Sequence, residues 1–130
     1  MNEPIWIPIG TLHLLHDRQL ELFGGLRGIR DEGAIESALA RPVNAWAYGQ
    51  AEDVETLAAT YLCAMARQQG YLDGNKRSAL AAMLVFLRIN GYKLVAPGPE
   101  LYAIVISAAT NEIGIEQVAA WVKKHVEAAP

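Results

Sequence analysis

The feature of this sequence that most constrains its fold is the apolar run that extends from about residue 76 to residue 90. Its letters, KRSALAAMLVFLRIN, place leucine, methionine, valine and phenylalanine around nearly the whole circumference of a helix. A helix that is apolar on all sides is buried among other elements. The run therefore predicts the central helix of a bundle, and Asn90 followed by Gly91 is a typical C-terminal stop.

Apolar residues at helical spacing also fill most of the remaining chain, and glycine or proline separates the periodic stretches. Asp31 is a candidate N-cap, and Asp53 is an acid placed to open a helix. The sequence thus predicts five further helices, over about residues 9–23, 32–42, 54–69, 100–110 and 114–127. Only residues 92–95 could form a strand, so the expected class is all-α with at most one hairpin.

Residues 42–51, PVNAWAYGQA, interrupt the helical pattern with a proline, an asparagine, a glycine and two aromatic residues. We expect a loop or a small hairpin here. The simplest interpretation of Trp46 and Tyr48 is that they pack this loop on the core. The alternative is contact with a partner, since aromatic residues concentrate at interface hot spots.

Length and composition fit a single domain that spans residues 1–130, with 52% apolar residues and one cysteine, Cys63, that cannot form an internal disulfide. The net charge of -3 argues against a protein that binds nucleic acid through bulk positive charge. No run of 18 apolar residues is present, so no membrane-spanning helix is expected. The first residues do not read as a signal peptide, and a cytoplasmic protein is expected.

The polar chemistry of the chain concentrates in the five residues DGNKR, from Asp73 to Arg77, at the start of the apolar run. The first N–H groups of a helix have no internal partners and, with the helix dipole, favour an anion. Gly74 would let a ligand approach the backbone, while Lys76 and Arg77 would supply a point charge and a bidentate fork for phosphate. Asp73 is a hard oxygen ligand suited to Mg²⁺ on a nucleotide triphosphate.

The competing interpretation of the same five residues is an ordinary helix start. Asp73 or Asn75 would then be the N-cap, and Lys76 and Arg77 would be solvated surface cations. The physics of the residues favours neither interpretation strongly. Two adjacent cations at the positive end of a helix are nevertheless a local cost, and such costs concentrate at functional sites.

The stretch DGNKRSAL…FLRINGY resembles the core motif of the Fic/Doc family, whose pattern reads His-x-Phe-x-Asp/Glu-Gly/Ala-Asn-Lys/x-Arg. The stretches LLHDRQLELFGG and GIRDEGAIESALARP are similar to the N-terminal half of its death-on-curing (Doc) branch. The resemblance extends over residues 9–125. It implies an all-α Fic-type helical bundle with a short flap loop or hairpin, and residues 42–51 fall where the flap is expected.

The resemblance also implies a function. Doc-like proteins are toxins of toxin-antitoxin modules that transfer a phosphoryl group, or less commonly AMP, from ATP with Mg²⁺ to a hydroxyl of a target protein such as a translation factor. The helix of a Phd-like antitoxin lies in a groove on the toxin. By position, Asp73 would hold the metal, Gly74 and Asn75 would line the anion cradle, and Lys76 and Arg77 would hold phosphates. Neither nucleic acid nor a membrane is an implied partner.

The sequence departs from the family pattern at Gln69, where the family has its general-base histidine, and at Tyr71, where phenylalanine is usual. A carboxamide can orient a hydroxyl, but it cannot carry the proton away. General-base catalysis typically contributes ~10²–10⁴-fold, so weakened transfer with retained nucleotide binding is expected. The alternative is a catalytically inactive Fic-fold protein that binds a nucleotide or a partner. The three histidines, at positions 13, 16 and 125, are more simply structural or exposed than catalytic.

Overall fold

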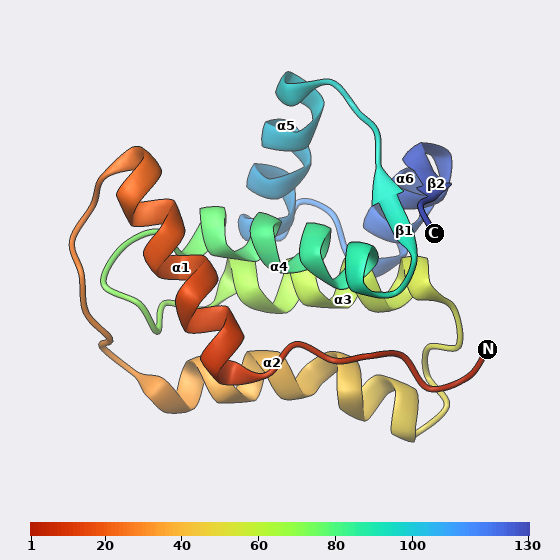
Figure 1. Ribbon diagram of the computed structural model, residues 1–130, viewed down its shortest axis with the longest axis horizontal. Coiled ribbons are helices and arrows are strands. Elements are labelled where there is room, and N and C mark those ends of the chain that lie inside the picture. The colour runs from red at the N-terminus through yellow and green to blue at the C-terminus, as the bar shows by residue number, and fades with distance from the viewer.

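The computed structural model describes all residues, 1–130, as a helical bundle with a small two-stranded sheet at one side (Figure 1). The helices are α1 (Ile9–Phe23), α2 (Glu32–Ala47), α3 (Val54–Arg67), α4 (Asn75–Ile89), α5 (Gly98–Ala109) and α6 (Ile115–His125). The strands are β1 (Tyr92–Leu94) and β2 (Val126–Ala128). The all-α class with one small pair of strands is therefore confirmed, and none of the helices is long and apolar enough to cross a membrane.

The most buried helix is α3, and the expectation that α4 is a central helix buried on nearly all sides is confirmed only in part. Ten of the 14 residues of α3 are buried, against seven of the 15 residues of α4. Helix α3 packs against α2, α4, α5 and α6. Leu80 of α4 stays partly exposed, because this side of α4 lies along a cavity rather than along another helix.

Side-chain caps start two of the helices at the expected residues. Asp31 accepts a hydrogen bond from the backbone N–H of Ala34 at 3.1 Å, which caps α2. Asp53 accepts one from the backbone N–H of Thr56 at 3.1 Å, which caps α3. Each cap of this kind stabilises its helix by about 1 kcal/mol.

Residues 42–47 are helical, so the expected loop or hairpin over 42–51 is wrong. Helix α2 continues through Pro42 to Ala47, and only the last four residues of the stretch form a turn. Proline inside a helix typically costs about 3 kcal/mol. Here Pro42 is buried in the α2–α3 packing, so tertiary contacts outweigh that local penalty. Trp46 packs against the core, whereas Tyr48 is 78% exposed.

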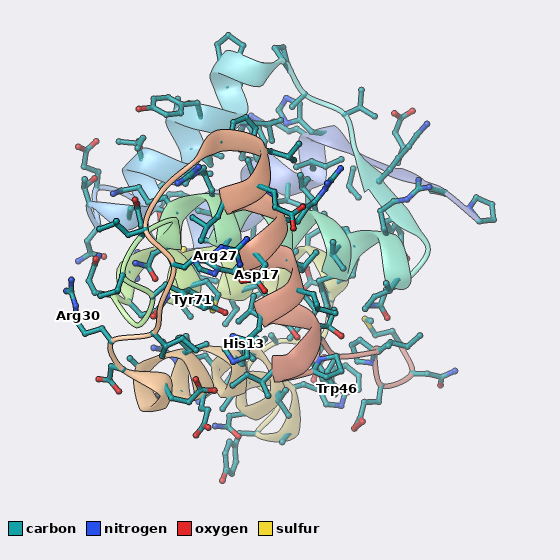
Figure 2. The ribbon with its side chains drawn as sticks, turned by 60° about the vertical axis from the view of Figure 1, so that its left-hand side comes forward. His13, Asp17, Arg27, Arg30, Trp46 and Tyr71 are labelled. Atoms are coloured by element: carbon teal, nitrogen blue, oxygen red, sulfur yellow. The ribbon has the colours of Figure 1, made fainter.

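The assignment of the flap to residues 42–51 is also wrong, for a geometric reason. The loop that carries the motif bonds to the start of α2, where Arg30 and Asp31 donate backbone N–H groups to the carbonyl of Gly70. A helix of 16 residues is about 24 Å long. Figure 2 shows Arg30 and Trp46 at opposite ends of α2, so residues 42–51 lie far from the motif.

The expected strand at residues 92–95 is present as β1, but its partner was not expected. The last helix ends at His125 and the chain continues as β2, which pairs antiparallel with β1 in the register Lys93 to Glu127. The helical pattern of residues 114–127 gives no sign of this change. Pairing with a strand more than 30 residues away supplies the hydrogen bonds that replace the last turn of the helix.

Candidate nucleotide site

The side chain of Asn75 fixes the shape of the motif loop that connects α3 to α4. Its Oδ1 accepts hydrogen bonds from the backbone N–H of Tyr71 at 3.1 Å and from Nε2 of Gln68 at 3.0 Å. Its Nδ2 donates to the Tyr71 carbonyl at 2.9 Å. Asn75 is buried, so its polar atoms act inside the loop. The helix N-cap is Gly74, and the interpretation of Asp73 or Asn75 as an N-cap is wrong.

Tyr71 anchors the loop in the space between α1 and α2. Its ring is buried and stacks on the ring of His16, with 3.6 Å between centroids. Its hydroxyl lies 2.7 Å from Nδ1 of His13, and Nε2 of His13 lies 3.0 Å from Oε1 of Glu32. Burial raises the pKa of Tyr71, so the hydroxyl keeps its proton and can donate it to His13. Figure 2 shows His13 and Tyr71 facing one another across this space.

His16 holds the loop at a second point. Its Nε2–H donates to the backbone carbonyl of Asp73 at 2.7 Å, and its side chain is buried. The third histidine, His125, bonds to the carbonyl of Trp121 in α6. None of the three histidines lines the cavity described next. The geometry thus favours a structural role for all three.

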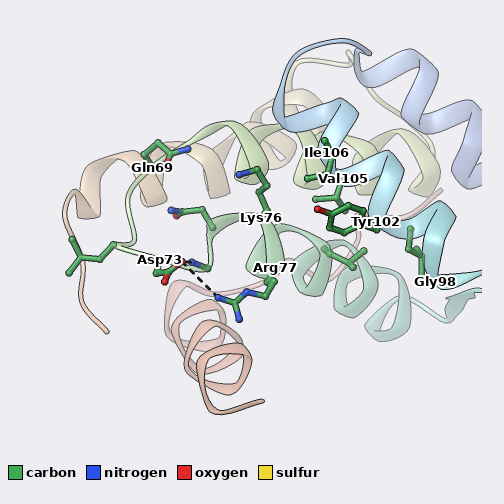
Figure 3. Close-up of a pocket in the computed structure, with 13 residues that line it drawn as sticks. Gln69, Asp73, Lys76, Arg77, Gly98, Tyr102, Val105 and Ile106 are labelled. Atoms are coloured by element: carbon green, nitrogen blue, oxygen red, sulfur yellow. Dashed lines mark hydrogen bonds and ion pairs between the residues drawn. The ribbon is translucent and has the colours of Figure 1, made fainter. Parts of the chain in front are cut away.

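A cavity of about 630 Å³ lies beside the start of α4 and is lined by every residue that the sequence assigned to the site. On one side are the motif residues Gln69, Asp73, Gly74, Asn75, Lys76 and Arg77. On the other side are apolar residues of α4 and α5, among them Leu80, Tyr102, Val105 and Ile106. Figure 3 shows these two sides facing one another, so the cavity joins a charged end to an apolar end.

The carboxylate of Asp73 is half-exposed and accepts two backbone hydrogen bonds. Leu26 donates its N–H to Oδ2 at 3.2 Å, and Gly74 donates its N–H to Oδ1 at 2.8 Å. These two bonds, and the nearby Arg77 guanidinium, hold the pKa of Asp73 below its ordinary value. Asp73 is therefore ionised at neutral pH.

The positive side of the cavity is formed by Lys76, Arg77 and the open start of α4. Lys76 is exposed, and Arg77 lies 3.9 Å from Asp73. No side chain caps this helix, so its first N–H groups are free to meet a ligand. Gly74 has a positive φ of 77°, which favours glycine, and a Cβ there would face His16 at 3.5 Å. The glycine thus serves the backbone turn more than the close approach of a ligand.

Gln69 is exposed at the edge of the cavity, and its side chain makes no hydrogen bond within the protein. The next residue, Gly70, is buried against α2, and an added Cβ would lie 2.6 Å from the Asp31 carbonyl and even closer to Ile35. A larger residue at this position would therefore not fit without a shift. Glycine at position 70 thus permits the close packing of the loop on α2.

The element that lies beside the motif is the loop over residues 24–31, which sequence reasoning did not place at the site. Leu72 donates its N–H to the carbonyl of Gly28 at 3.0 Å, and Ile29 forms a bridge with Tyr71. The signal that could have identified this loop is its three glycines, which all adopt positive φ. Arg27 and Arg30 do not line the cavity, and Figure 2 shows Arg30 extending away from the protein.

A bundle of six helices with a small pair of strands is consistent with the Fic type of fold. A model of the Fic/DOC family matches residues 6–87, and the chain belongs to this family. It is 42% identical over 105 residues to "Protein kinase doc" of Escherichia phage P1, which covers 81% of this chain and 82% of that protein. It is 37% identical over 102 residues to "Toxin Doc" of Mycolicibacterium smegmatis, which covers 75% and 78%.

Proposed function

We propose that this chain is the Doc-like toxin of a toxin-antitoxin module and transfers a phosphoryl group from ATP to a hydroxyl of a target protein. The observation that carries the proposal is the cavity at the uncapped start of α4, which brings Asp73, Lys76 and Arg77 together. The names of the two relatives, a protein kinase and a toxin, support the same reading. AMP transfer is the less favoured variant of the reaction.

The charged end of the cavity suits the triphosphate of ATP. The free N–H groups of α4 and its dipole favour phosphate oxygens. Lys76 would supply a point charge, and Arg77 would supply a planar fork that can bind two oxygens at once. Gly74 and Asn75 would shape this cradle, since one permits the turn and the other fixes the loop.

Asp73 is the residue that would hold Mg²⁺. Its carboxylate lines the cavity, is ionised, and retains lone pairs beyond the two that accept backbone hydrogen bonds. No group of three metal-binding side chains exists in the protein, so phosphate oxygens and water would complete the coordination. The donor set therefore fits a magnesium ion that arrives with its nucleotide. When bound, the ion would offset negative charge on the phosphates.

In the transfer step, a bond forms between the target oxygen and the γ-phosphorus, and the bond to the bridging oxygen of ADP breaks. Lys76 and Arg77 would stabilise the charge on the phosphoryl group, and Gln69 would orient the target hydroxyl through a hydrogen bond. Gln69 cannot keep the proton, which would pass to water. We therefore expect a rate lower by ~10²–10⁴-fold than a histidine at this position would give.

The loop over residues 24–31 is the flap in this proposal, because it lies beside the motif and bonds to Gly70, Tyr71 and Asp73. It would align the backbone of the target, for which a translation factor is the leading candidate. A Phd-like antitoxin would cover a groove with one of its helices. With such partners, the protein would act in the cytoplasm.

The alternative function is that of an inactive member of the family that binds a nucleotide or a partner without transfer. Gln69 favours this inactive alternative, because its side chain lies at the edge of the cavity and has no basic atom. The intact run from Asp73 to Arg77 favours the enzyme. The enzyme and the nucleotide-binding form of the alternative share the same site.

The experiment that tests the proposal is protein labelling in a cell extract with Mg²⁺ and ATP that carries its label on either the γ- or the α-phosphate. The variants are Gln69→His and Arg77→Gln, with Gln50→His as a matched control on an exposed glutamine outside the cavity. We expect faint γ-labelling by the native chain, a gain with Gln69→His, no gain with Gln50→His, and loss with Arg77→Gln.

Three outcomes separate the possibilities. Labelling from α-labelled ATP would replace phosphoryl transfer by AMP transfer. Binding of ATP without a gain in Gln69→His would support the inactive, binding-only alternative. Calorimetry that detects no binding of magnesium ATP to the native chain would refute the nucleotide site, and with it both the enzyme and the nucleotide-binding alternative.

A further inference from the structure

The side chain of Arg77 is held by the C-terminal end of α1, which lies outside the motif. Its Nη1 donates a hydrogen bond to the carbonyl of Gly24 at 3.1 Å. Its guanidinium lies over the ring of Phe23, 5.8 Å from the centroid, within the range of a cation–π contact. Figure 3 shows Arg77 extending toward α1, whereas Lys76 extends to the opposite side.

This contact explains how Arg77 can stand at the N-terminal end of α4, where a positive charge is unfavourable. The dipole of α4 disfavours a positive charge on its first turn, where Arg77 stands. The C-terminal end of α1 carries the opposite partial charge, and it has no basic residue of its own in its last turn. The C-terminal end of α1 therefore provides Arg77 with a favourable dipole interaction, whereas the N-terminal end of α4 does not.

Packing alone does not explain the place of Phe23. Its side chain is 68% exposed, does not belong to the core and does not line the cavity. The ring of Phe23 instead lies against the guanidinium of Arg77. The same turn also holds the acid of the site, because Leu26 donates to Asp73, and a Cβ on Gly25 would lie 2.8 Å from Oδ2 of Asp73.

We infer that Phe23 is a positioning residue that orients the Arg77 guanidinium for phosphate, together with the carbonyl of Gly24. The inference rests on the proposed function, since it takes Arg77 as a phosphate ligand. Phe23 acts through Arg77 and not on the nucleotide itself. The flap and the motif arginine are thus directly connected, so the residue type at the end of α1 sets how well Arg77 binds.

Calorimetric titration with magnesium and the non-hydrolysable analogue AMP-PNP tests the inference. Phe23→Leu removes the ring from an exposed site, and we expect affinity to fall about two- to five-fold, the size of an exposed cation–π contact. Phe23→Tyr keeps an aromatic face and should restore affinity to within about two-fold of the native chain. Tyr48→Leu is the matched control, since Tyr48 is also an exposed aromatic residue and lies at the far end of α2.

A second measurement separates action through Arg77 from direct contact with the nucleotide. In the Arg77→Gln background, Phe23→Leu should have no further effect on affinity. The Nε–H resonance of Arg77, observed by NMR without ligand, should lose its ring-current shift in Phe23→Leu and keep it in Phe23→Tyr. A general structural role for Phe23 would instead weaken binding in the Arg77→Gln background as well.

The outcomes distinguish this inference from the proposed function. If Arg77→Gln binds AMP-PNP as well as the native chain, the phosphate role of Arg77 fails, and the inference fails with it. If Arg77→Gln weakens binding but Phe23→Leu does not, the nucleotide site stands and the role of Phe23 is refuted. A loss that persists in the Arg77→Gln background would make Phe23 a direct ligand contact and would also overturn the inference.

Discussion

The hydroxyl of Tyr71 lies 2.7 Å from Nδ1 of His13, and this contact connects the motif loop to α1. The family's usual phenylalanine has no hydroxyl to satisfy at this position. Here the extra polar atom is buried and finds an acceptor on a neighbouring helix. Glu32 fixes the tautomer of His13 by accepting from Nε2 at 3.0 Å. The three residues therefore form one set, and substitutions within it are expected to be coupled.

The first prediction concerns this coupling. His13→Leu leaves the buried Tyr71 hydroxyl without a partner, and we expect the free energy of unfolding to fall by about 1–3 kcal/mol. Tyr71→Phe should cost less, because the partly exposed His13 can bond to water. The double variant should recover part of the loss from His13→Leu. Urea denaturation of the four proteins measures the coupling, and strictly additive effects would contradict it.

The second prediction concerns the packing of Gly70 on α2. Gly70→Ala places a Cβ against the Asp31 carbonyl and Ile35, and we expect a loss of about 1–3 kcal/mol in unfolding free energy. Gly10→Ala is the control, since Gly10 lies in α1 with open space around it and should gain up to about 1 kcal/mol. Thermal denaturation compares the two. A Gly70→Ala variant as stable as the native chain would show that the loop can move away from α2.

The third prediction concerns pH. The folded state lowers the pKa of Asp73, chiefly through the N–H groups of Leu26 and Gly74. Its ionised form therefore favours folding at pH values above the ordinary carboxyl pKa, and this contribution disappears as pH falls through the lowered pKa. We expect the stability difference between the native chain and Asp73→Asn, measured by denaturation in EDTA, to shrink toward acid pH. A difference that is constant from neutral to acid pH would exclude this linkage.

The fourth prediction concerns Ser78, which follows Arg77 in α4. Its side chain is completely buried, and its Oγ has no hydrogen-bond partner. An unpaired buried hydroxyl is unfavourable, so Ser78→Ala should leave stability unchanged or raise it by up to about 1 kcal/mol. Ser78→Val is the companion variant, since its extra methyl groups test how tightly this site is packed. A clear loss of stability in Ser78→Ala would reveal a partner for the hydroxyl.

Local signals in the sequence were enough to place most of the helices. The N-caps predicted at Asp31 and Asp53 are present in the structure, because a cap depends only on the three residues that follow it. Pro42 gave the wrong boundary for α2, because packing on α3 compensates for the proline and no local pattern reports that packing. For the same reason the sequence predicted burial of α4 on nearly all sides, whereas α3 is the more buried of the two helices.

The six candidate residues that the sequence singled out lie within one short stretch, residues 69–77, and all six line the cavity. The parts that were missed come from distant segments. Leu26 reaches Asp73 through its backbone N–H, and a backbone contact leaves no mark on side-chain identity. Phe23 reads in the sequence as one more apolar residue of the first helix, and only its exposure in the fold distinguishes it.

The pairing of β1 with β2 has a practical consequence for work on this protein. The two strands join the segment after α4 to the end of α6, so they tether a stretch of chain that includes α5. Helix α5 supplies Tyr102, Val105 and Ile106 to the cavity. Removal of the C-terminal tail, or a purification tag fused directly to it, would weaken the pairing of β1 with β2. Helix α5 would then be held less firmly in its position beside the cavity. Constraints on the apolar end of the cavity thus originate in residues that come last in the chain.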